Sequence, residues 1–243
     1  MTKNKKLIRL IFIAMMIAIG VVISPILRVE GMCPMAHLIN VTCAVFLGPF
    51  PAFLCAALIG IIRMIFMGIP PLALTGAVFG AFFSGLFYRL SKGKLLFAVI
   101  GEIFGTGIIG ALISYPVMAF IWGRDGLTWF FYVPSFIAGT LIGGSIAFIL
   151  LKQLNKAGQL ARIQKLLGSE VYHSDNDILK DALAIGFGAP IAYLAVLVAE
   201  NNIIKSSQGF IPYIKVIAAL MFIAGAIIYY MVKKAGTNRN KEN

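Results

Sequence analysis

Hydrophobic residues occur in long runs along the chain, separated by short clusters of charged residues, Gly and Pro. The runs lack the alternation of polar and apolar positions that is typical of barrel strands. They therefore predict membrane helices, whose backbone groups are satisfied internally. A crossing of about 30 Å needs about 20 residues at about 1.5 Å of rise each. Eight runs are candidate helices, at residues 7–24, 35–48, 51–67, 72–90, 95–121, 130–151, 181–200 and 212–232.

The boundary between the second and third runs is the least distinct. The second run is short, and the sequence Gly48-Pro49-Phe50-Pro51 is the only break before the third. Because Pro ends helices and favours turns, this sequence predicts a tight turn between two helices.

The composition supports a membrane protein. Of 243 residues, 60% are hydrophobic and 12% are charged, whereas soluble domains have about 45–50% apolar and about 25% charged residues. We therefore expect an all-α polytopic membrane protein in the lipid bilayer of the cell membrane, without a sizeable soluble domain.

The net charge of +12 would suggest a nucleic-acid partner in a soluble chain. Here most of the Lys and Arg residues lie at helix ends that alternate along the chain, which predicts that both termini are cytoplasmic. The charge is then a topology signal, and no nucleic-acid partner is expected. The exceptions to this distribution are Arg28, Arg63, Arg124, Lys205 and Lys215.

One long polar stretch divides the chain. Residues 152–180 are expected to form a cytoplasmic link between a six-helix domain, 1–151, and a two-helix membrane extension with a basic tail, 181–243. The link contains His173-Ser174-Asp175-Asn176-Asp177. This sequence fits either a metal site or a solvated segment that caps the following helix, and the second interpretation is favoured.

The sequence Gly105-Thr106-Gly107-Ile108-Ile109-Gly110 matches the G-x-G-x-x-G pattern of dinucleotide-binding domains. However, it lies within a hydrophobic run and does not follow a strand, so we expect these glycines to permit close helix packing. Glycines four residues apart recur on other runs, at Gly76 and Gly80 and at Gly139 and Gly143.

Catalytic and metal-binding patterns are absent from the sequence. There is no P-loop, no H-E-x-x-H and no paired nucleophile and base in the hydrophobic runs, and the spacing of the three cysteines fits neither a zinc nor a redox motif. We therefore expect a non-enzymatic transport subunit without a cofactor or metal. Any ATP would be hydrolysed by a partner.

Two charged residues lie away from the ends of the hydrophobic runs. Arg63 falls in the third run and Glu102 in the fifth. Such residues cost about 2.5–3.5 kcal/mol each at a helix centre and are candidates for a binding site. The alternative is that Arg63 and Glu102 pair with each other or with backbone carbonyls.

Neutral polar and aromatic residues extend this candidate site. His37 and Asn40 are three residues apart and share a helix face. They fit a small heterocycle, although a His near a membrane interface is often only a packing residue. Tyr115 and Trp129 could form an aromatic wall for a ring or belong to an interfacial belt.

Ala14 and Ala18 are four residues apart on the first run and form a stripe of small side chains. The stripe fits either packing inside the bundle or docking of a partner helix.

With these residues in place, the chain resembles the ThiW family of substrate-binding (S) components of energy-coupling factor (ECF) transporters, over about residues 7–151. The resemblance rests on the order Cys33-Pro34-x-x-His37-x-x-Asn40-Val41, Leu47-Gly48-Pro49, Arg63, the helix from Gly76 to Gly85 ending at Tyr88-Arg89, Gly101-Glu102-x-x-Gly105-Thr106-Gly107 and Ala111-Leu112-x-x-Tyr115-Pro116.

The resemblance implies a six-helix bundle that captures its solute in an outward-facing pocket, closed by the loop after the first helix. It implies docking through Ala14 and Ala18 on a transmembrane coupling protein driven by two ABC-type ATPases. The implied ligand is hydroxyethylthiazole, a thiamine precursor, held by His37, Asn40 and a Tyr, with Arg63 and Glu102 neutralising each other beneath it. The six-helix pattern does not account for residues 152–243.

The main alternative is a self-sufficient, cation-coupled secondary transporter of a small polar solute, in which Glu102 carries a proton or cation. The sequence shows no inverted repeat, which makes this alternative the weaker one.

Overall fold

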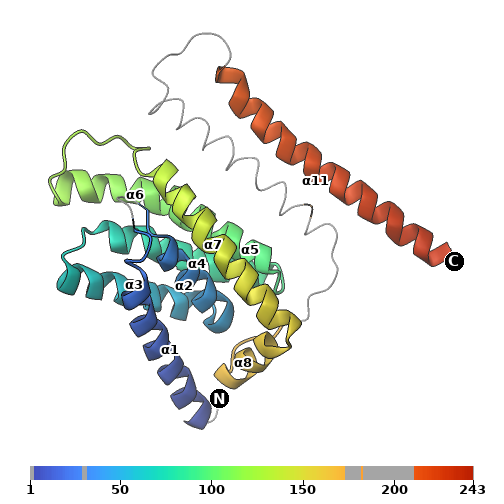
Figure 1. Cartoon of the computed structure of the whole chain (residues 1–243), viewed down its shortest axis with the longest axis horizontal. Helices are drawn as coiled ribbons and strands as arrows, with labels where there is room; N and C mark the ends of the chain where they lie inside the picture. The colour runs from blue at the N-terminus through green and yellow to red at the C-terminus, as the bar shows by residue number, and fades with distance from the viewer. Residues whose placement is uncertain (1–2, 29–31, 173–181, 183–210, 243) are drawn as a thin grey trace. The chain divides into compact units, whose positions relative to one another are not determined.

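The computed structural model describes residues 3–28, 32–172, 182 and 211–242, and every regular element in these residues is a helix. The chain forms two compact units, residues 1–174 and 175–243, which are described separately (Figure 1).

The six helical segments predicted in the first unit are all present. Two π-helical stretches, η1 and η2, continue α5 and α6, so that one helical segment runs from Leu95 to Ile121. In chain order the elements are α1 (Lys3–Ile23), α2 (Pro34–Leu47), α3 (Pro49–Met67), α4 (Leu72–Leu90), α5 (Leu95–Glu102), η1 (Ile103–Gly110), α6 (Ala111–Pro116), η2 (Val117–Ile121), α7 (Val133–Lys156) and α8 (Gln159–Leu167).

Among the residues that the structure describes, five helical segments are long and apolar enough to cross a membrane: α1, α3, α4, the segment Leu95–Ile121 and α7. The chain is therefore an all-α polytopic membrane protein. The expected count of six spans is not confirmed, because α2 has only 14 residues.

Helix α2 forms the core of the first unit. Twelve of its residues are buried, and it packs against α3, α4 and α7. The predicted tight turn between α2 and α3 is present. Gly48 alone separates the two helices with φ of 89°, a conformation that favours Gly, and Pro49 begins α3.

The first unit extends past residue 151, where the domain boundary was expected. Helix α8 packs on α1, α2 and α7. Its Gln164 is buried and donates hydrogen bonds to the Val45 carbonyl at 2.9 Å and to the Tyr88 hydroxyl at 3.1 Å. The described part of the expected 152–180 link is thus largely helical: one side of α8 packs on the bundle, while most of its other residues are exposed. The sequence from His173 to Asp177 lies outside the described residues.

One end of the first unit is strongly basic. The beginnings of α1 and α5 and the ends of α4 and α7 meet there, and they carry Lys3, Lys5, Lys6, Arg9, Arg89, Lys92, Lys94, Lys152 and Lys156. We call it the basic end. Arg9 Nη2 donates to the Leu47 carbonyl at 2.9 Å, and Arg89 donates two hydrogen bonds to Glu170, at 3.2 and 3.1 Å. Tyr172 also donates to Glu170, and burial raises the pKa of Tyr172, which keeps its hydroxyl neutral.

In the second unit, α11 (Ile211–Glu242) contains the expected helix at 212–232. The helix expected at 181–200 lies outside the described residues apart from Ala182. That these two segments form a membrane extension stays a prediction.

Candidate functional site

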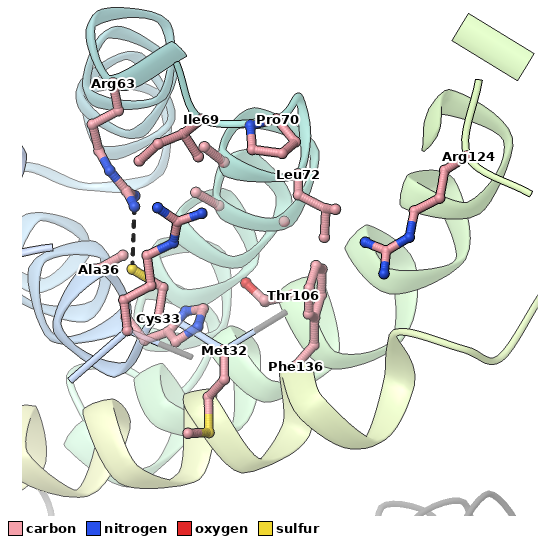
Figure 2. A pocket seen from close by; sticks show the side chains of 15 residues that line it. Met32, Cys33, Ala36, Arg63, Ile69, Pro70, Leu72, Thr106, Arg124 and Phe136 are labelled. Atoms are coloured by element: carbon pink, nitrogen blue, oxygen red, sulfur yellow. Dashed lines mark hydrogen bonds between the residues drawn. The ribbon is translucent and has the colours of Figure 1, made fainter. Parts of the chain in front are cut away.

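A pocket opens at the end of the first unit opposite the basic end. The end of α1, the beginnings of α2, α4 and α7, and the end of α3 meet there. The pocket encloses about 620 Å³, including open space at its mouth. Its polar lining residues are Arg28, Cys33, His37, Arg63, Thr106 and Arg124, and its larger apolar ones are Met32, Ile69, Pro70, Leu72 and Phe136 (Figure 2).

Beneath the pocket, a cluster of polar side chains surrounds Glu102. The Oε1 atom of this fully buried carboxylate lies 2.8 Å from His37 Nδ1, 3.0 Å from Asn40 Nδ2 and 3.1 Å from Thr106 Oγ1, which are all positioned to donate to it. His37 and Asn40 share one face of α2, as predicted, and Glu102 and Thr106 are one helical turn apart. We call these four residues the Glu102 cluster. It fixes the position of the His37 ring in the pocket wall.

The glycines that form four-residue spacings create the space for the Glu102 cluster. A Cβ atom at Gly80 would lie 2.6 Å from both Glu102 carboxylate oxygens, and one at Gly143 would lie 2.9 Å from His37 Cβ. Gly105 lies against the Phe79 carbonyl in the same way. The prediction that these glycines permit close helix packing is confirmed, and the G-x-G-x-x-G match is part of this packing.

The Glu102 carboxylate is satisfied on one side only. Its Oε2 atom is buried and has no hydrogen-bond partner among the described residues. An unsatisfied buried polar atom costs about 1–3 kcal/mol, and the cost is higher for a charged group. The carboxylate can therefore accept one more hydrogen bond.

Arg63 does not pair with Glu102, and this expectation was wrong. Only 3% of Arg63 is exposed, and its Nη2 atom donates to Cys33 Sγ at 3.4 Å. Cys33 in turn donates to the Ser24 carbonyl at 2.9 Å. The reason is position: Arg63 lies near the end of α3, beside the connection from α1 to α2, whereas Glu102 packs against Gly80 in the middle of α4 and is paired with His37.

Tyr115 and Trp129 contact each other, with ring centroids 4.7 Å apart. Within the described part of the chain, neither residue lines this pocket. Trp129 is 56% exposed, which fits the alternative of an interfacial belt. The aromatic surface of the pocket comes from Phe136 instead, whose ring packs against Gly76.

Of the lining residues, the sequence-based site prediction contained only His37 and Arg63; it missed the apolar ones, including Phe136, and four polar ones, Arg28, Cys33, Thr106 and Arg124. The two arginines carried a usable signal, because both were exceptions to the distribution of basic residues. Figure 2 shows Arg63 and Arg124 on opposite sides of the pocket. Among the described residues, no group of His, Cys, Asp and Glu could hold a metal ion.

Ala14 and Ala18 are both exposed in the first unit. Together with Leu10 and Val22, which are also exposed, they form a stripe along one side of α1. Packing inside the described bundle therefore does not explain the two alanines.

A comparison with protein families is consistent with this architecture. The model of the family "Thiamine-precursor transporter protein (ThiW)" matches residues 10–157. No match was found among curated proteins or among solved structures. The matched segment covers more than half of the chain and includes every residue that lines the pocket. The chain therefore belongs to the ThiW family of thiamine-precursor transporter proteins.

Proposed function

We propose that this chain is the substrate-binding subunit of an ATP-driven ECF-type importer, and that it binds hydroxyethylthiazole or a related small heterocycle. The observation that carries the proposal is the pocket, which combines neutral polar groups with an aromatic ring at one end of the bundle.

The proposal gives different roles to the site residues. His37 and Thr106 line the pocket and contact the solute, with the ring of the solute against Phe136. Asn40 and Glu102 act through His37, because they hold its side chain in place from beneath. Arg63 contacts the solute near the connection between α1 and α2.

The decisive experiment is a binding measurement on the purified full chain in detergent. Hydroxyethylthiazole should bind, and His37→Ala and Asn40→Ala should weaken binding by about tenfold through lost hydrogen bonds to the solute or to the cluster. Ser145→Ala, on the exposed side of α7, is the matched control. Failure of every thiamine-related heterocycle to bind a folded protein would contradict the ligand assignment.

Coupling to ATP requires partners in this proposal. A transmembrane coupling protein docks on the stripe at Ala14 and Ala18, where small side chains permit close helix approach, and two ABC-type ATPases hydrolyse ATP. Ala18→Phe should abolish uptake without changing solute binding. Ser145→Phe, on the exposed side of α7, adds similar bulk elsewhere and should leave uptake unchanged. Equal loss of uptake in both variants would contradict docking at the stripe.

The orientation in the cell membrane follows from the basic end. We assign the basic end and both termini to the cytoplasm, so that the pocket opens to the outside. This orientation fits an importer, because the solute then enters the pocket directly from the medium.

A secondary transporter is the second candidate, and the unsatisfied Oε2 atom of Glu102 favours it, because a buried carboxylate can carry a proton. Uptake by cells that express only this chain, abolished by an uncoupler, would establish this alternative. Uptake that requires the coupling protein and the ATPases would exclude it.

A further inference from the structure

The Glu102 cluster fixes the orientation of the His37 ring, which lines the pocket. His37 Nδ1 lies 2.8 Å from Glu102 Oε1. In a neutral His ring, one nitrogen carries a proton and donates, while the other accepts a hydrogen bond. The nitrogen that carries the proton therefore decides whether His37 offers the solute a donor or an acceptor.

The other contacts of Glu102 Oε1 indicate which nitrogen of His37 carries the proton. Asn40 Nδ2 donates to the Ala77 carbonyl at 3.1 Å and to Oε1 at 3.0 Å, and Thr106 Oγ1 donates to Oε1 at 3.1 Å. Because two donors already point at Oε1, a carboxyl proton would lie on the unpartnered Oε2 atom instead. Oε1 is thus an acceptor whether or not Glu102 is ionised, and the proton of the neutral His37 ring is on Nδ1.

The second ring nitrogen, Nε2, is then an acceptor without a partner. Among the described residues, the hydrogen bond of the His37 ring is the one from Nδ1. A Cβ atom at Gly139 would lie 3.2 Å from His37 Nε2 and 3.0 Å from Cγ of Met32, which also lines the pocket. The lack of a side chain at Gly139 therefore leaves room beside Nε2.

The other polar side chains of the described lining complement such an acceptor. Arg28, Arg63 and Arg124 carry N–H donors and no acceptor. The Cys33 sulfur accepts from Arg63 and donates to a backbone carbonyl. A second proton on the His37 ring would add positive charge to a pocket that these arginines already line, which favours the neutral ring.

We propose that His37 Nε2 accepts a hydrogen bond from a hydroxyl or amine group of the solute and thereby selects solutes that carry such a donor. In hydroxyethylthiazole the donor is the hydroxyl group, because the ring nitrogen carries no proton. A solute without a donor would leave Nε2 buried and unpaired when it fills the pocket, which is unfavourable. The inference rests on the proposed function for the identity of the solute and adds the group by which the solute is selected.

The tautomer of His37 can be measured without any solute. The chain has one other histidine, His173, so NMR spectra of the full chain in detergent, with isotope-labelled histidine, are simple to assign with His173→Gln. The couplings between ring protons and ring nitrogens should show a protonated Nδ1 and an unprotonated Nε2 in His37. A proton on Nε2, with or without one on Nδ1, would overturn the inference.

The consequence for the solute is measured by isothermal titration calorimetry with three probes. These are hydroxyethylthiazole, its methyl ether, which keeps the oxygen but lacks the donor, and the ethyl analogue, which lacks the oxygen. The alcohol should bind about tenfold or more tighter than the ether, because only the alcohol satisfies Nε2. The ether should bind no tighter than the ethyl analogue. An ether that binds as tightly as the alcohol would overturn the inference.

A variant then connects this preference to His37. His37→Leu removes the acceptor, so the ratio of alcohol to ether affinity should fall to about one. Thr140→Val is the matched control, because Thr140 is also buried but donates to the Ile137 carbonyl of its own helix and does not line the pocket. It should leave the ratio unchanged. An unchanged ratio in His37→Leu would show that the ether is excluded by size, and the inference would be wrong.

The outcomes separate this inference from the proposed function. If the thiazoles bind but the alcohol has no advantage over the ether, the inference is wrong and the proposed function stands. If no thiazole binds, the proposed function fails, and the tautomer of His37 decides whether the pocket presents an acceptor. If His37→Leu fails to fold, the tautomer and the affinity ratio of the wild type decide the result.

Discussion

The two ends of the first unit both carry positive residues, yet in different physical settings. At the basic end, the Arg89 side chain is 51% exposed and pairs with Glu170, which is 58% exposed. At the pocket, Arg63 is 3% exposed and contacts a sulfur atom. Exposed pairs contribute little to stability, whereas a buried cation in a membrane protein is costly.

This difference separates the two uses of positive charge in the chain. Most positive residues at the basic end are exposed, apart from the buried Lys94 and the half-buried Arg9, so their position can be set by membrane topology alone. The burial of Arg63 has no such explanation and points to a function at the pocket. If the comparison is correct, substitutions at the centre of the unit and at the pocket should have larger effects than substitutions at the basic end.

The largest effect is expected for Glu102→Ala. His37, Asn40 and Thr106 would lose their shared acceptor, and breaking a buried pair typically costs about 3–5 kcal/mol. Thermal unfolding in detergent should show a large loss of stability. Glu102→Gln keeps an acceptor oxygen and should therefore lose less stability than Glu102→Ala. Equal stability of Glu102→Ala and the wild type would remove the basis for treating the cluster as the centre of the site.

The second-largest loss of stability is expected for Gly143→Val. The Cβ atom at this position would overlap with the Pro34 carbonyl and lie 2.9 Å from His37 Cβ, so α7 must move away from α2. Overpacking typically costs about 1–3 kcal/mol, and binding of the solute should weaken as well because His37 moves. Ser145→Val on the exposed side of α7 should leave both properties unchanged.

Gln164→Leu tests the packing of α8 near the basic end. The variant leaves the Val45 carbonyl and the Tyr88 hydroxyl without the donor that they share, which should cost about 1–3 kcal/mol. Gln159→Leu, at an exposed position of the same helix, is the control. Solute binding should be retained in both, and a loss of binding in Gln164→Leu alone would show that the two ends are coupled.

The smallest effect is expected for Arg89→Gln. Its pair with Glu170 is exposed, and such pairs contribute about 0–1 kcal/mol. Unfolding measured at low and high salt should show a small difference that disappears as salt is added. A loss as large as that of Glu102→Ala would contradict the contrast between the two ends.

The helices of the first unit could be predicted from the sequence because bilayer hydrocarbon enforces long apolar runs with internal hydrogen bonds. The shared face of His37 and Asn40 followed from helix geometry in the same way. The partner of Glu102 could not be predicted, because it depends on how α2 and α5 pack. By charge, Arg63 was an equally plausible partner of Glu102. The structure excluded it, because Arg63 lies near the end of α3 whereas Glu102 packs against the middle of α4.

The polar stretch after residue 151 also shows that the composition of a segment does not by itself predict its packing. Its charges favoured a solvated link, but α8 has an apolar side that includes Leu160 and Leu167, both buried. Burial of these residues against α1, α2 and α7 outweighed the polar average of the segment.

By itself, the sequence determined the class of the protein and the approximate bounds of the helices in the first unit. It also identified the polar and charged residues within the hydrophobic runs, which are costly in a membrane. These features depend only on local composition and periodicity. Only the tertiary structure decided which of these residues meet. It brought Arg28, Arg63 and Arg124 to one pocket and His37 to Glu102, since contacts between distant segments depend on the close approach of helices at their glycines.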